Sequence, residues 1–177
     1  MENSPVFGAS WRLFEPHDLT FAYQLASIVD PRWWAVSRSG LSPQNVVARA
    51  STFSAGVVVV DSDGYDTGLA VLRETGTAST GALDVWALPT AASVAAVESV
   101  IVELLASAFT LSNIRALYHD RFENDPCLLG ATESLWETEV VYPEFALIDG
   151  RYESRATRVL QRDKFEARFA RSIDVQS

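Results

Sequence analysis

The sequence predicts an α+β fold in which one mixed, mostly antiparallel sheet carries helices on both faces. Three observations predict it: three strand patterns follow one another directly, a long apolar helix comes after them, and two long strands form a closing hairpin. A sheet between helical layers buries the apolar side of each of these elements. The chain has 177 residues, of which 48% are hydrophobic, and it shows no internal repeat or linker pattern. We therefore expect a single domain over residues 1–177.

The first part of the chain predicts a short strand at residues 10–14 and helices over residues 16–28 and 42–53. Asp18 is the expected N-cap of the first helix, because a carboxylate can accept from the free N–H groups of the first turn. Ser42 is the expected N-cap of the second helix, and the proline that follows it suits the first helical position.

The centre of the chain gives the clearest strand patterns. Four of the six residues at 55–60 are valine, which is β-branched, and a turn separates this strand from a second one at residues 67–73. A third strand at residues 82–88 ends at a proline, and the longest helix follows over residues 91–109. A further strand is expected at residues 114–118.

The end of the chain predicts a long hairpin and a terminal helix. Residues 136–147 and 152–161 flank an Asp-Gly pair, which is typical of a hairpin turn. One helical turn is expected at residues 126–129, and an amphipathic helix at residues 162–171.

Composition restricts the class of partner. The chain carries 23 acidic and 14 basic residues, a net charge of −9, and such a surface repels both phosphate backbones and anionic lipids. We therefore expect no nucleic-acid partner and no membrane association. The most apolar helix, residues 94–109, is interrupted by Glu98 and Glu103 and is shorter than the ~20 apolar residues of a membrane span. With no secretory signal pattern visible, the sequence predicts a cytoplasmic protein.

Metal and disulfide chemistry are not indicated. The chain has one cysteine, Cys127, and two histidines without the spacing of a paired metal ligand. Cys127 as a nucleophile would need a partner histidine and a lowered pKa, so we expect a structural role for it.

Three strings, in order, resemble the GCN5-related N-acetyltransferase (GNAT) superfamily. WRLFEPHDL, from residue 11, is similar to its opening strand and first helix, and IDGRYE, from residue 148, is similar to its closing hairpin. Trp33-Trp34 with the following Ser-Arg-Ser-Gly resembles an actinobacterial branch. The similarity covers about residues 10–169. It implies the same mixed sheet and transfer of an acyl group from a CoA thioester to an amine.

The resemblance implies that acyl-CoA binds where the third strand meets the long helix. This loop usually carries an Arg/Gln-x-x-Gly-x-Gly/Ala pattern, whose glycines let backbone N–H groups approach the pyrophosphate at a helix N-terminus. The corresponding segment here, PTAASVAA from residue 89, has no glycine, arginine or lysine, so the chain resembles a divergent member with a degenerate loop. Six residues are expected to contact acetyl-CoA or another acyl-CoA: Val85, Ala87, Leu88, Thr90, Ser93 and Asn124.

Candidate catalytic groups lie on two strands. The resemblance implies a carboxylate base on the central strands, and Asp84 is the only ionisable group of the strand at residues 82–88. The tyrosine that often reprotonates the thiolate has no counterpart at residues 121–139, so His119 or Tyr118 is expected to assist proton release. The alternatives stay open that Asp84 holds a loop and that His119 is structural.

The acceptor pocket is expected to be aromatic. Strand alternation places Asp84 and Trp86 on the face opposite to Leu83. Trp33 and Trp34 lie in the connection between the first two helices, where the superfamily varies with substrate, and together with Trp86 they are expected to bind the acceptor. Core packing is the alternative for these rings.

Two functions are left open. The first is an N-acyltransferase that uses acyl-CoA, or an acyl-carrier-protein thioester, to modify a small-molecule amine. The second is a catalytically degenerate GNAT-fold protein with a ligand-binding or accessory role. Relatives often dimerise, so a homodimer is a further expectation. The transferase requires a V-shaped gap, in which the strands near residues 83–88 and 114–118 diverge enough to admit a slender thioester arm.

Overall fold

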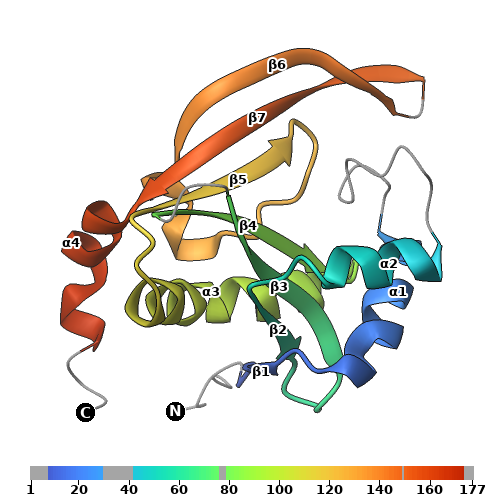
Figure 1. Ribbon diagram of the computed structural model, residues 1–177, viewed down its shortest axis with the longest axis horizontal. Coiled ribbons are helices and arrows are strands. Elements are labelled where there is room, and N and C mark those ends of the chain that lie inside the picture. Colours follow the sequence, from blue (N-terminus) through green and yellow to red (C-terminus); the bar gives the residue numbers. More distant parts are fainter. Residues whose placement is uncertain (1–7, 30–41, 76–78, 149, 174–177) are drawn as a thin grey trace, which may run out of the picture.

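The computed structural model describes residues 8–29, 42–75, 79–148 and 150–173 (Figure 1). Seven strands form one sheet in the order β1-β2-β3-β4-β5-β7-β6, and every neighbouring pair is antiparallel except the parallel β4–β5 pair. The strands are β1 (Ser10–Leu13), β2 (Ala55–Val60), β3 (Asp66–Glu74), β4 (Thr80–Ala87), β5 (Ala116–Phe122), β6 (Glu137–Ile148) and β7 (Arg151–Gln161). The predicted mixed, mostly antiparallel sheet is confirmed.

Helices cover both faces of this sheet, as predicted. They are the 3₁₀ turn η1 (Pro16–Asp18), α1 (Leu19–Ile28), α2 (Pro43–Ala50), α3 (Ala91–Leu111), the 3₁₀ segment η3 (Gly130–Leu135) and α4 (Arg162–Ile173). Side chains of α1 and α2, such as Leu25 and Val46, pack with Leu69 and Trp86 on one face. The inner side of α3 packs on the other face, together with Phe165 of α4. Figure 1 shows α1 and α2 together, with α3 separate from them across the sheet.

The long helix α3 is the main core helix. By length and composition it could cross a membrane, but its inner side is buried against the strands, as in the core of a folded domain. Its buried apolar residues are Ala96, Val97, Val100, Ile101, Leu104, Leu105 and Phe109.

The approach of α3 to the sheet is close at one point. A Cβ atom at Gly68 of β3 would lie 2.3 Å from Cγ2 of Val97 and 2.9 Å from the carbonyl oxygen of Trp86. Glycine is therefore required here by space rather than by its backbone conformation. Gly68 is opposite Ala87 in the sheet, so this contact fixes α3 beside the end of β4.

Several local predictions differ from the structure. Asp18 does not cap α1: its carboxylate accepts two 2.7 Å bonds from Arg12 and one from the N–H of Glu15. Ser42 does cap α2, but that helix ends at Ala50 rather than near residue 53. The helical turn expected at residues 126–129 is absent, and η3 begins only at Gly130, whose φ of 47° suits glycine.

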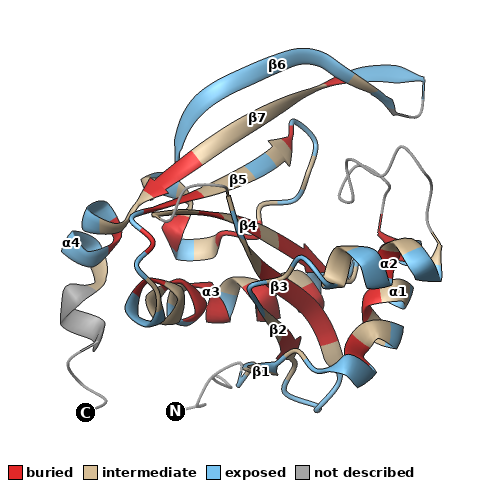
Figure 2. Cartoon of the chain, in the orientation of Figure 1, coloured by how far each residue is buried: buried red, intermediate tan, exposed pale blue. Residues whose placement is uncertain are grey.

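The β6–β7 hairpin reaches away from the rest of the sheet (Figure 1). Most of β6 is exposed (Figure 2), and β6 is an edge strand. Six large apolar side chains of the hairpin are between 39% and 65% exposed: Val140, Val141, Tyr142, Phe145, Leu147 and Tyr152. Exposed apolar side chains gathered on one hairpin are typical of an interaction surface.

Candidate active site

The strands β4 and β5 diverge along their length. They pair only through Thr80–Ala82 and Ala116–Tyr118. Beyond that point β4 continues to Ala87 paired with β3, while β5 continues to Phe122 paired with β7. The V-shaped gap required by the sequence-based hypothesis is therefore present.

One edge of this gap is unpaired backbone. The amide of Leu88 donates to the carbonyl of Thr67 at 2.9 Å, which sets the alternation of the antiparallel β3–β4 ladder. That alternation turns the N–H and C=O groups of Leu83, Val85 and Ala87 away from β3 and toward the gap. Two amides, those of Val85 and Ala87, thus face the opening where β5 no longer accepts from them.

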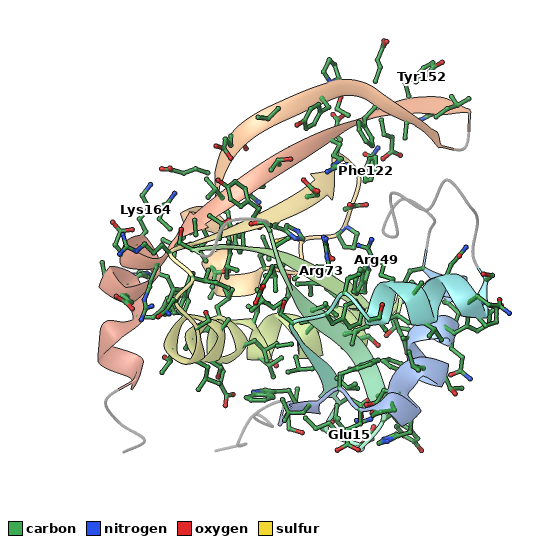
Figure 3. The ribbon with its side chains drawn as sticks, viewed as in Figure 1. Glu15, Arg49, Arg73, Phe122, Tyr152 and Lys164 are labelled. Carbon is green, nitrogen blue, oxygen red and sulfur yellow. The ribbon has the colours of Figure 1, made fainter. Side chains whose placement is uncertain are left out.

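A cavity of about 270 Å³ lies at the gap. Its walls come from α2, β3, β4, β5, the loop after β5 and β7, so the tertiary fold alone assembles it. The lining residues are Arg49, Arg73, Asp84, Val85, Trp86, His119, Asp120, Arg121, Phe122, Asp125, Pro126, Leu128 and Arg155. Figure 3 shows Arg49 and Arg73 close together between α2 and the central strands, and Phe122 near the end of β5.

The carboxylate of Asp84 is held by two guanidinium groups. Arg73 donates to it from Nε at 2.6 Å and from an Nη at 3.2 Å, and Arg49 donates from an Nη at 3.1 Å. The hydrogen bond to Asp84 is the main reason that the pKa of Arg73 is raised. Both oxygens of Asp84 are thereby engaged in hydrogen bonds to arginine.

The imidazole of His119 lies at the apex of the gap. Its Nδ1 is 3.0 Å from the carbonyl oxygen of Leu83, and a carbonyl only accepts, so Nδ1 carries the proton. Burial lowers the pKa of His119, although the hydrogen bond to Leu83 and the charges of Asp84 and Asp120 oppose the shift. The ring is therefore neutral near pH 7, and Nε2 has a lone pair that can accept a proton.

The first turn of α3 has a partly satisfied N-terminus. The Thr90 hydroxyl caps the helix by accepting from the amide of Ser93 at 3.1 Å. The Ser93 hydroxyl is buried and accepts from Thr67 and Thr90, so it serves this network and does not face outward. The amides of Ala91 and Ala92 are left without an acceptor inside the helix, and both residues are exposed.

The remaining candidate residues are dispersed. The ring of Trp86 packs in the core beside α1 and α2 and also forms part of the cavity wall. Tyr118 is not among the residues that line this cavity, and Asn124 lies in an exposed turn after β5. Trp33 and Trp34 lie outside the described residues. Val85 and Ala87 pack toward α3, opposite to Trp86, as the strand alternation predicts.

A second polar cluster lies next to the cavity around Glu133. Arg158 and Arg121 both donate to its carboxylate, and the Cys127 thiol donates at 3.1 Å. Burial raises the pKa of Glu133, but the hydrogen bonds from Cys127 and Arg158 outweigh it and the net shift is downward. Burial, together with the bond to Glu133, raises the pKa of Cys127, which disfavours the thiolate and a nucleophilic role.

Solved structures with a similar architecture include acetyltransferases. A protein described as a phosphinothricin N-acetyltransferase superposes with a TM-score of 0.70 at 17% identity, covering 87% of this chain and 98% of the other. A spermidine N-acetyltransferase from Vibrio cholerae, solved with CoA and spermine, gives a TM-score of 0.68 at 19% identity, covering 89% and 97%. The chain has the GNAT fold.

At these identities the likeness shows the fold alone. No protein-family model matches the sequence, and no curated protein matches it significantly. Mutant forms of the Vibrio cholerae spermidine/spermine N-acetyltransferase give a similar result, with a TM-score of 0.70 at 18% identity over 90% of this chain and 97% of the other. The function of the GNAT-fold cavity therefore has to be argued from its own residues.

No pattern in the sequence predicted the arginines of the site. Arg49, Arg73, Arg121 and Arg155 come from four different elements, and no spacing along the chain connects them. The one available signal was a run of three polar residues, His119, Asp120 and Arg121, in the second half of β5.

Proposed function

We propose that the protein is an N-acyltransferase that moves an acyl group from acyl-CoA, or from an acyl-carrier-protein thioester, to a small amine. The observation that carries this proposal is the divergence of β4 and β5, with unpaired amides along one edge and a neutral imidazole at its apex. The solved neighbours are named as N-acetyltransferases, and one of them holds CoA and spermine.

The residues present fit a thioester arm better than they fit a pyrophosphate. The gap-facing amides of Val85 and Ala87 can bond an amide-rich arm in the manner of a missing strand. At the N-terminus of α3, the amides of Ala91 and Ala92 and the helix dipole favour an anion. The loop has no glycine, however, that would let backbone N–H groups approach a pyrophosphate closely. This contrast supports either weak binding of free acyl-CoA or a donor carried on a protein.

The mechanism follows from the groups at the gap. Acyl-CoA, when bound, supplies a thioester carbonyl that is attacked by the amine nitrogen, with formation of the C–N bond and release of the thiol. The amide of Val85 or Ala87 donates to the carbonyl oxygen as negative charge develops on it. Nε2 of His119 accepts the proton that the amine loses and can return it to the departing sulfur.

In this mechanism His119 is the preferred base and Asp84 is a positioning residue. The carboxylate of Asp84 already accepts three hydrogen bonds from Arg49 and Arg73, whereas Nε2 of His119 is an available acceptor. Tyr118 stays a weaker candidate because it does not contribute to the cavity wall.

A test combines donor binding with turnover. Acetyl-CoA at millimolar concentration should raise the melting temperature, because a ligand of the folded state stabilises it, and an amine panel should give thiol release. His119→Gln should abolish most turnover and keep the donor-induced shift. Arg162→Gln serves as the control, because Arg162 is at the start of α4 and does not line the cavity. Absence of both the shift and the turnover with CoA and carrier-protein donors would refute the transferase.

The degenerate alternative has one observation in its favour, which is the loop without glycine. A ligand-binding or accessory protein would show the donor-induced shift without thiol release from any amine. The same experiment therefore separates the two functions.

We also propose a homodimer in which a second copy covers the exposed apolar side chains of the β6–β7 hairpin. An edge strand with exposed apolar side chains is supporting evidence, because such surface usually marks an interface.

A further inference from the structure

Four arginines converge on the cavity of an otherwise acidic protein. Arg49 comes from α2, Arg73 from β3, Arg121 from β5 and Arg155 from β7. The carboxylates that line the same cavity are three, Asp84, Asp120 and Asp125, whereas the whole chain has a net charge of −9. The cavity is thus a local excess of positive charge on a negative molecule.

Several of these donors are left without a protein partner. Among the described residues, Nε of Arg49, Arg121 and Arg155 is buried and has no hydrogen-bond partner. These nitrogens are enclosed by protein atoms, so they show only that the arginines are not fully bonded within the described part of the chain. The four guanidinium groups that line the cavity match carboxylate and phosphate oxygens in geometry as well as charge, and this favours an oxyanion there.

The three carboxylates of the cavity already have protein partners. Asp84 accepts from Arg49 and Arg73, and Asp120 accepts from Arg155 and, at 2.6 Å, from Thr157. Asp125 accepts from the amide of Phe122 at 2.8 Å. A polyamine would need free carboxylates and would meet four guanidinium groups instead. The charges that line the cavity therefore do not suit an acceptor that carries only positive charge.

The position of the cavity assigns the anion to the acceptor rather than to the donor. The first turn of α3, where a pyrophosphate would bind, contributes none of the described residues that line it. His119 does line it, so an amine that reaches Nε2 lies in the same space as the arginines. The volume of about 270 Å³ is at the small end of ligand pockets.

We propose that the acceptor is a small zwitterionic amine, such as an amino acid, whose carboxylate or other oxyanion is bound by Arg49 and its neighbouring arginines. This inference rests on the proposed function, because it takes the cavity to be the acceptor site. It deepens that function by excluding polyamines as the preferred class.

The experiment uses matched pairs of acceptors that differ only in a carboxylate. Ornithine and putrescine, arginine and agmatine, and phenylalanine and phenethylamine are compared with one acyl donor by thiol release. We expect the carboxylate-bearing member to have the higher kcat/KM by about tenfold or more, because a site built to bond a polar group rejects an analogue without it. Equal values, or a preference for the amine without carboxylate, would overturn the inference.

Variants locate the effect. Arg49→Gln should raise KM for ornithine by a larger factor than KM for putrescine, so that the preference for ornithine falls. Arg49→Lys should restore this preference only in part, because one point charge replaces the guanidinium fork. Arg162→Gln should behave as wild type. If Arg49→Gln fails to fold, judged by its melt, the wild-type comparison still decides.

A second readout separates this inference from the proposed function. Thermal melts of the wild-type protein with 10 mM of each acceptor measure binding without turnover. A larger rise in melting temperature with the amino acids, without any acyl transfer, would contradict the transferase and support the anion site. Acyl transfer without a preference for the carboxylate in either readout would contradict the anion site and support the transferase. If ADP abolishes the rise in melting temperature that the amino acids cause, the arginines bind the phosphates of the donor, and the inference is contradicted.

Discussion

Replacing Gly68 by alanine tests the close contact that fixes α3 beside the gap. The added Cβ would lie 2.3 Å from Cγ2 of Val97 and 2.9 Å from the carbonyl oxygen of Trp86. The first conflict can be relieved by moving a side chain, but the second involves backbone. Overpacking of this kind costs about 1–3 kcal/mol, and we expect Gly68→Ala to lower the free energy of unfolding by about 2–3 kcal/mol.

A double-mutant cycle separates the part of this cost that comes from the contact with Val97. Val97→Ala removes the methyl group that meets the new Cβ, at a cost of its own from the cavity it leaves. In that background Gly68→Ala should cost about 1 kcal/mol less than in wild type, since only the Trp86 contact remains.

The assay is urea unfolding followed by tryptophan fluorescence, with the slope of the transition checked for constancy across variants. Acetyl-CoA affinity measured on the same variants should fall with Gly68→Ala and recover in part in the double variant. A Gly68→Ala protein within about 0.5 kcal/mol of wild type, or an equal cost in both backgrounds, would refute the reasoning.

Three further predictions follow from the charges and surfaces of the fold. Because burial lowers the pKa of His119, kcat at saturating amine should rise with pH through an apparent pKa below the ordinary ~6.5. This rise should be absent from His119→Gln, and a rise that the substitution leaves unchanged would point to another base. The hydrogen bond from Arg12 is the main cause that lowers the pKa of Asp18, so this carboxylate stabilises the folded state above its unfolded pKa of about 3.9 and ceases to do so as the pH falls through its lower folded value. Asp18→Asn should therefore cost about 1–2 kcal/mol at pH 7, discounted for the partly exposed Arg12, and the difference from wild type in urea unfolding should shrink below pH 4; a pH-independent difference would contradict this. Light scattering of the wild-type protein should give twice the monomer mass. Phe145→Glu, on the exposed hairpin, should give a folded monomer. A wild-type monomer at micromolar concentration would rule out the proposed dimer.

Most of the fold could be predicted because local pattern and tertiary environment agree. The β-branched run of β2 was predicted with its observed bounds, Ala55–Val60, since such side chains suit a strand buried between layers. The strand β5 was predicted at residues 114–118 but occupies Ala116–Phe122. Its second half carries His119, Asp120 and Arg121, which line the cavity, and a rule based on apolar runs cannot follow a strand into a polar site.

The site was less predictable because its arginines are brought together only by the fold. Asp84 was singled out as an isolated ionisable group on a strand, but its partners Arg73 and Arg49 are 11 and 35 residues away in sequence. The register between β3 and β4 brings Arg73 to Asp84, and the packing of α2 on the same face of the sheet brings Arg49 there. Asp18 shows the same effect, since a residue suited to a helix cap instead pairs with Arg12 across the β1 connection.

The most direct test of the diverging strands is hydrogen exchange at single residues of β4, with and without acetyl-CoA. The amides of Asp84 and Trp86 face β3 and should exchange slowly in both states. The amides of Val85 and Ala87 face the gap, so they should exchange faster without ligand and become protected when the donor binds. Equal, slow exchange of all four amides without ligand, unchanged by the donor, would mean that β4 and β5 are joined along their length and would contradict the account.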